Sequence, residues 1–137
     1  FLISEKSFLF SIIEEIEILR DSRGFVFEPL DTDDIIYQKN IHTVITLPGF
    51  IRGNHYHKKG IERLVIYGPA LIRIKEEDEI KDLTVSEDKA LRITIPPGIS
   101  HAIKNIGNRS NLLIAFNTEE HKTNNPDVYP EILIDDE

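Results

Sequence analysis

Short apolar stretches separated by turn residues run along most of the chain. Five stretches rich in strand-forming residues stand out: 42–47, 63–67, 70–75, 91–95 and 111–116. Turn residues follow three of them directly: Pro48-Gly49, Gly68-Pro69 and Pro96-Pro97-Gly98. Short strands at this spacing predict an all-β sandwich or barrel.

Two further segments allow more than one interpretation. Residues 8–19 place Phe8, Ile12, Ile16 and Leu19 at helical spacing, but the alternation at 16–18 also fits a strand. Residues 76–89 are polar and mostly acidic, which favours a solvated loop or an exposed hairpin.

The composition narrows the class of protein. The chain has 137 residues, 40% of them apolar, and a formal net charge of −8 from 16 basic and 24 acidic residues. That size and balance predict one soluble domain and disfavour binding to nucleic acid or to an anionic membrane. The longest apolar runs, such as 112–116, are too short to span a bilayer, and no signal pattern opens the chain, so we expect a cytoplasmic protein. The absence of cysteine excludes disulfides and thiolate sites.

The stretch 49–62 carries the candidate chemistry. His55 and His57 share a face if they lie on a strand, because side chains repeat with period two. Glu62 follows after the turn Lys58-Lys59-Gly60 and can face back toward them from the next strand. A third histidine, His101, follows a second turn at 96–98.

Three imidazoles and a carboxylate form a ligand set suited to Zn²⁺, Fe²⁺, Mn²⁺ or Ni²⁺. Any one of these histidines alone would be an ordinary surface or core residue, and it is the joint pattern that predicts a shared site. His42 and His121 fit no such pattern, so we expect a strand residue and a polar loop residue.

These positions resemble the two motifs of the cupin superfamily. The first motif, Gly-x5-His-x-His, three or four residues, Glu-x6-Gly, is matched by Gly49, His55, His57 and Glu62, while the closing Gly68 comes one residue early.

The second cupin motif, Gly-x5-Pro-x-Gly-x2-His-x3-Asn, is matched by Pro96, Gly98, His101 and Asn105, with Ala90 in place of the opening glycine. The resemblance implies a double-stranded β-helix, or jelly-roll barrel, in a single domain of residues 1–137. We expect an N-terminal segment at 1–20 and a cupin core at 21–133, with His55, His57, Glu62 and His101 as metal ligands inside the barrel mouth.

Three narrower matches point to nucleotide-sugar enzymes. Residues 21–28 resemble the D-x-R-G-x-F-x-E opening of nucleotide-sugar epimerases. Residues 52–57, R-G-N-H-Y-H, and 124–129, with N-P-D-x-Y, resemble the cupin domain of capsular polysaccharide UDP-sugar reductase/epimerases. In that family the domain binds zinc and epimerises C3 of a nucleotide 4-keto-6-deoxy sugar beside a reductase domain, of which this chain shows no G-x-G-x-x-G fingerprint. Metal-independent 3,5-epimerases and dTDP-sugar 3,4-ketoisomerases are similar too.

The resemblance implies proton abstraction next to a ketone. Zinc is then the first choice of metal, with iron, manganese or nickel as alternatives. Without a metal, His55 or His57 would act as the base. Tyr67 is our candidate proton donor, with Tyr56 and Tyr129 as alternatives, although Tyr67 could equally be a core tyrosine.

Three residues are candidates for binding the substrate, which we expect to be a small-molecule nucleotide sugar. Arg52 offers paired donors suited to phosphate, or it pairs with an acidic side chain at the rim. Arg23 has the same candidate role, or it braces the turn at Gly24. Asn54 could position a hydroxyl or cap its loop, and Asn117 is a possible lining residue.

The sequence leaves three functions open. The first is an epimerase or ketoisomerase in surface polysaccharide biosynthesis, the second a non-catalytic cupin module that binds a metal or sugar, and the third a metal-dependent dioxygenase. By analogy with the related families we expect a homodimer.

Overall fold

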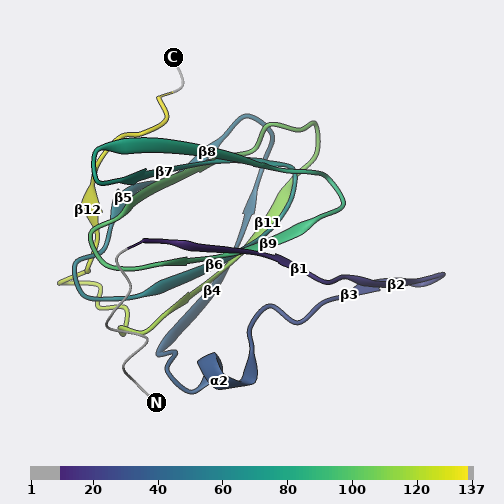
Figure 1. The fold of residues 1–137 in the computed structure, drawn as a ribbon, viewed down its shortest axis with the longest axis horizontal. Coiled ribbons are helices and arrows are strands. Elements are labelled where there is room, and N and C mark those ends of the chain that lie inside the picture. Colours follow the sequence, from purple (N-terminus) through teal and green to yellow (C-terminus); the bar gives the residue numbers. More distant parts are fainter. Residues whose placement is uncertain (1–9, 136–137) are drawn as a thin grey trace.

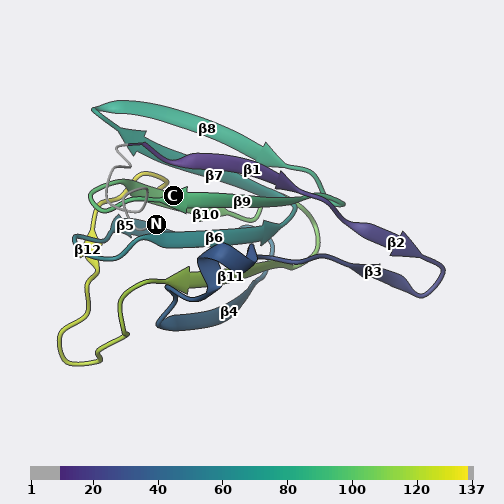
Figure 2. The same cartoon turned by 60° about the horizontal axis from the view of Figure 1, so that its bottom comes forward.

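Residues 10–135 are described by a computed structural model. They form two five-stranded antiparallel sheets that face each other, and a two-stranded ribbon extends to one side (Figures 1 and 2). The first sheet runs in the order β1 (Ile12–Ile16), β9 (Ala90–Ile95), β6 (Glu62–Tyr67), β11 (Asn111–Asn117), β4 (Asn40–Thr46). The second runs β12 (Tyr129–Pro130), β5 (Ile51–Tyr56), β10 (Ser100–Lys104), β7 (Ala70–Glu76), β8 (Glu79–Val85). The predicted all-β barrel fold is confirmed.

The main core lies between the two sheets because alternate residues of each strand point to the same side. Ile66 and Ile93 from one sheet and Ile72 and Ile74 from the other are fully buried there. A second apolar cluster covers the outer face of the first sheet, where residues 16–30 pack on Val65 and Phe116. Both faces of strand β6 are therefore buried.

The segment between the ribbon and β4 crosses that outer face. The ribbon consists of β2 (Leu19–Asp21) and β3 (Gly24–Val26), and a single helical turn, α2 (Thr32–Ile35), follows it. Arg92 holds the segment against the sheet, because its guanidinium donates hydrogen bonds to the carbonyl of Pro29 and to the carboxylate of Asp31.

The five predicted strands all form. In residues 8–19, of which 8 and 9 lie outside the described residues, the helical alternative is wrong. Residues 12–16 pair with β9 instead, from Ile12 opposite Thr94 to Ile16 opposite Ala90. Residues 12–16, which precede the predicted core of 21–133, thus belong to the first sheet. Residues 76–89 form the exposed hairpin, with β8 paired to β7.

Candidate functional site

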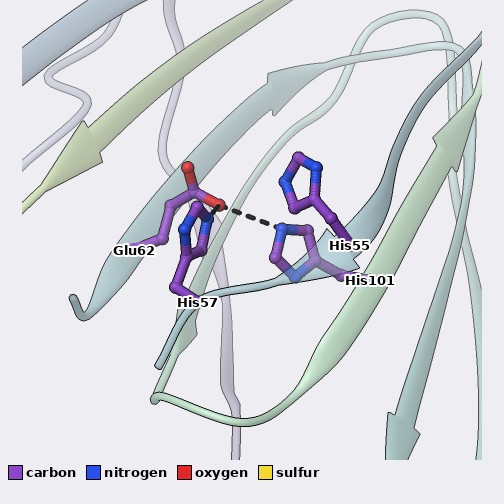
Figure 3. Close-up of side chains that lie close together, drawn as sticks. All are labelled: His55, His57, Glu62 and His101. Atoms are coloured by element: carbon purple, nitrogen blue, oxygen red, sulfur yellow. Dashed lines mark hydrogen bonds and ion pairs between the residues drawn. The ribbon is translucent and has the colours of Figure 1, made fainter. Parts of the chain in front are cut away.

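His55, His57, Glu62 and His101 meet between the two sheets. One ligand atom from each of the four side chains lies within 4.8 Å of the others. Figure 3 shows the three imidazoles and the carboxylate converging. His55 lies on β5, Glu62 on β6 and His101 on β10, and His57 is one residue beyond the end of β5. The structure thus brings together all four residues predicted to be metal ligands.

The pairing of β5 with β10 places His55 directly opposite His101. The register shifts beside this pair, where Gly53 adopts φ +87° and Asn54 φ +58°. A Cβ atom on residue 53 would lie 2.7 Å from the carbonyl oxygen of His101, so only glycine allows the strands to approach this closely. The second turn is attached to the first motif as well, because the Gly98 N–H donates to the carbonyl of His57 over 2.6 Å.

Glu62 provides the negative charge of the cluster. Its Oε1 lies 3.2 Å from His57 Nε2 and 3.0 Å from His101 Nε2. Burial alone would raise the pKa of this carboxyl group, but the contacts with His101 and His57 hold it well below its usual range. Glu62 is therefore an ionised carboxylate inside the protein.

Backbone carbonyls set the orientation of two imidazoles. His57 Nδ1 donates to the carbonyl of Asp127 over 2.6 Å, and His101 Nδ1 donates to that of Ile99 over 3.1 Å. Both rings therefore present Nε2 to Glu62. Burial opposes a charge on His57, but the hydrogen bond and the charge of Glu62 raise its pKa above the ordinary value. Burial lowers the pKa of His55 to about 4, helped by the charge of His101, so His55 is neutral at neutral pH.

This donor set fits a divalent transition metal. His101 Nε2 is buried and makes no well-directed hydrogen bond within residues 10–135, although it lies close to Glu62. A buried imidazole nitrogen that faces a carboxylate without a well-directed hydrogen bond is a place where a bound metal ion would be stabilising. Three imidazole nitrogens and one carboxylate match the ligands that zinc, iron, manganese and nickel accept.

A hollow of about 190 Å³ opens next to the cluster. Besides His55, His57 and Glu62, it is lined by Asn40, His42, Asn117, Glu119, Glu120, His121, Asp127 and Val128. None of these lining residues is a lysine or an arginine. The hollow is smaller than the roughly 300–1,000 Å³ of pockets that enclose a drug-sized ligand. It can thus hold a sugar ring, while a nucleotide would extend outside it.

His42 and His121 lie on a strand and in an irregular segment, as predicted, and both also line the hollow. His42 lies on β4 and its Nδ1 contacts Asn40 Oδ1 at 3.0 Å. It shares parity with Val44, which packs on the main core, and this inward periodicity was the available signal. For His121, which lies in an irregular segment after β11, the sequence carries no such signal.

Tyr67 does not join the cluster, and the structure agrees with the alternative expectation of a tyrosine packed in an apolar core. It is five residues beyond Glu62 on the same strand, and an odd step sends its side chain to the opposite face. There its ring stacks on Phe25, with centroids 4.8 Å apart, in the outer apolar cluster.

The three predicted substrate-binding residues also lie elsewhere. Arg23 is on the β2–β3 ribbon, where it pairs with Asp21 and leaves 88% of its side chain exposed. Arg52 donates to Thr46 Oγ1 over 3.2 Å and lines a different hollow with Ile45, Leu47, Phe50 and Ile51.

The Asn54 side chain makes its hydrogen bonds with the C-terminal segment. Its side-chain oxygen accepts the N–H groups of Leu133 and Ile134, and its amide donates to the carbonyl of Ile134. Asn54 therefore does not line the hollow as the predicted substrate contact requires, and its partners lie about 80 residues away along the chain.

The chain matches known proteins over most of its length. Residues 19–129 match the family described as "Polysaccharide biosynthesis C-terminal domain". UDP-2-acetamido-2,6-beta-L-arabino-hexul-4-ose reductase of Pseudomonas aeruginosa is 30% identical over 112 residues, covering 80% of this chain and 29% of that protein. The spore coat polysaccharide biosynthesis protein SpsL of Bacillus subtilis is 25% identical over 122 residues, covering 78% of each. The chain thus spans less than a third of the first relative.

Solved structures of other proteins also superpose on this chain. The capsular polysaccharide assembling protein CapF from Staphylococcus aureus superposes with a TM-score of 0.64 at 29% identity, covering 86% of this chain and 32% of that one. The dTDP-4-dehydrorhamnose 3,5-epimerase from Bacillus anthracis superposes at 0.71 and 15% identity, covering 91% and 80%, which shows a shared fold alone.

Among residues 10–135, the structure contains no helix with the length and apolar character needed to cross a membrane. The cupin-type barrel and the relation to capsular polysaccharide enzymes, both predicted from the two motifs and the three shorter matches, are confirmed. From these matches, the chain belongs to the polysaccharide biosynthesis C-terminal domain family.

Proposed function

We propose that this protein is an epimerase or ketoisomerase that acts on a nucleotide-linked 4-keto-6-deoxy sugar in the biosynthesis of a surface polysaccharide. The observation that carries the proposal is the buried cluster of three histidines and Glu62 at the edge of a hollow of sugar size. The family match and the nucleotide-sugar names of its relatives support the class of substrate.

The 4-keto group acidifies the proton on C3, and the resulting enolate needs stabilisation. We propose that His55, His57, Glu62 and His101 hold a divalent metal, zinc in the first place. When bound, such a metal supplies Lewis acidity to the ketone oxygen. With these four residues as ligands, His42 and His121 are the imidazoles lining the hollow that can accept or return a proton.

If the reaction proceeds without a metal, His55 is the better placed of the two bases that the sequence predicts. Its ring is neutral, whereas both nitrogens of His57 already face Asp127 and Glu62. His55 also lines the hollow directly.

Deuterium uptake followed by NMR tests the proposal. Zinc-loaded protein in D₂O is mixed with UDP- and dTDP-linked 4-keto-6-deoxy sugars. We expect deuterium at C3, lost in His55→Ala, and uptake at C5 as well would assign a 3,5-epimerase. A folded, metal-loaded protein that exchanges no proton in any of the sugars would overturn the proposal and favour a binding module, while oxygen consumption with iron would indicate a dioxygenase.

A homodimer and a cytoplasmic location belong to the same proposal. Strand β4 is at the edge of its sheet and exposes Ile41 and Ile45, by 60% and 54%. Natural proteins commonly cover unpaired apolar edges. Light scattering should give about twice the 15.8 kDa mass of one chain, and a monomeric mass would contradict the homodimer.

A further inference from the structure

The turn that joins His57 to Glu62 is held from outside by Asp127. The Asp127 carboxylate accepts three consecutive backbone N–H groups of the turn, from Lys58, Lys59 and Gly60, each over 2.9 Å. Because this turn connects two candidate ligands, its conformation fixes their separation.

The same residue contacts a ligand directly through its backbone. The Asp127 carbonyl accepts the Nδ1 proton of His57 over 2.6 Å. A carbonyl oxygen can only accept, so this bond selects the form of His57 that directs Nε2 toward Glu62 and His101. One residue thus sets both the turn and the ring orientation.

The segment that carries Asp127 is itself anchored on the second sheet. Tyr129 pairs with Tyr56 on strand β5 and stacks on its ring, with centroids 5.5 Å apart. Two residues further on, the Glu131 carboxylate accepts hydrogen bonds from Lys75 and Ser100. The segment that carries Asp127 is therefore fixed against the second sheet, which keeps the Asp127 carboxylate next to the turn.

We infer that Asp127 is a positioning residue for the metal centre, which orients His57 and fixes the turn between His57 and Glu62. This inference rests on the proposed metal site. Residues that orient metal ligands typically contribute about 10–100-fold to metal affinity. The role also explains the N-P-D-x-Y stretch, which the proposed chemistry leaves unused.

Cobalt binding tests the inference, because the visible spectrum of Co²⁺ reports ligand geometry. Affinity is measured by competition with a chelator for wild type, Asp127→Ala and Asp127→Asn. We expect a loss of about 10–100-fold with a changed spectrum for Asp127→Ala, and a smaller loss for Asp127→Asn, which retains one acceptor oxygen.

Asp135→Asn is the control, since it removes one charge from an exposed position of the same C-terminal segment, away from the turn. We expect its Co²⁺ affinity and spectrum to stay at the wild-type values. Equal losses in Asp127→Ala and Asp135→Asn would overturn the inference, and so would an unchanged Asp127→Ala protein.

A second measurement separates this inference from the proposed function. If the wild-type protein binds no Co²⁺, the proposed metal site fails. The tautomer of His57 is then read from the ¹⁵N spectrum of the metal-free protein at alkaline pH, where the imidazole is neutral. We expect the Nδ1–H form in wild type. Asp127→Ala keeps the backbone carbonyl but releases the turn, so we expect His57 to lose its fixed orientation and to show a mixture of tautomers. Identical spectra would show that the Asp127 carboxylate does not position His57 and would overturn the inference.

Discussion

The two faces of strand β6 are both buried, yet they are built differently. Glu62 and Leu64 point between the sheets, where Glu62 meets two histidines and Leu64 joins the main core. Val65 and Tyr67 point outward, where residues 16–30 cover them with apolar side chains. On the inner face at Glu62 a charge is compensated by polar contacts, whereas on the outer face apolar surface is removed from water.

The comparison shows why adjacent residues of one strand should respond differently to mutation. The inner face depends on the identity of its ligand atoms, so a change that preserves shape can still abolish its chemistry. The outer face depends on volume, so its cost appears in the free energy of unfolding. The four predictions below test this division, beginning with the largest effect.

Glu62→Gln keeps the size of the side chain but removes its charge. We expect metal affinity to fall by at least about 100-fold, because losing a ligand costs more than losing a residue that orients one. Deuterium exchange at C3 should disappear. Chelator competition and NMR measure the two effects, and a Glu62→Gln protein with wild-type affinity would show that Glu62 is not a ligand.

Val65→Ala tests the outer face of the same strand. Val65 is 1% exposed, so losing its methyl groups should lower the free energy of unfolding by about 1–3 kcal/mol. Metal affinity and the exchange rate should stay at wild-type values. Urea unfolding measures the stability, and a loss of metal affinity as large as that of Glu62→Gln would mean that the two faces are not independent.

Much of the inner face could be predicted because its signals are local. His55, His57 and Glu62 lie within eight residues, and period two with one turn is enough to bring them together. The strands from 42–47 to 111–116 could also be predicted, since alternation and turn residues mark each one.

The outer face could not be predicted in this way. Whether Tyr67 faces a site or a covering segment depends on residues 16–30, which arrive from a distant part of the chain. Asn54 and Asp127 likewise receive their roles from contacts across about 70–80 residues. No local pattern reports such contacts, so the sequence predicts a substrate contact for Asn54 and no role for Asp127.

The pH dependence of stability tests how the charge of the inner face is balanced. The pKa of His55 is lowered from 6.5 to about 4, so the folded metal-free protein binds fewer protons than the unfolded chain in that interval. Its contribution to stability is therefore present above pH 6.5 and is lost as the pH falls toward 4. Because the His55 ring is only partly buried, solvent screening reduces its contribution to the free energy of unfolding to about 1 kcal/mol.

His55→Gln isolates the contribution of His55 to stability. The substitution is needed because His57, whose pKa is raised, changes the stability with pH in the opposite direction. The stabilising contribution of His57 is present below pH 6.5 and is lost as the pH rises through its raised pKa. Urea unfolding in the presence of a chelator should show a smaller loss of stability on acidification for His55→Gln than for wild type. Equal losses in the two proteins would contradict the lowered pKa of His55.

Tyr67→Phe should have the smallest effect, and it separates the two faces most sharply. The substitution removes only the hydroxyl group and keeps the ring that stacks on Phe25 and Phe27. We expect stability within about 0.5 kcal/mol of wild type and an unchanged rate of deuterium exchange. Removing a proton donor in the hollow would instead lower the rate by about 10²–10⁴-fold.

His42→Gln is the variant to compare with Tyr67→Phe, because His42 does line the hollow. A rate that falls in Tyr67→Phe but not in His42→Gln would mean that the outer face of β6 takes part in the reaction, and the division drawn between its two faces would be wrong.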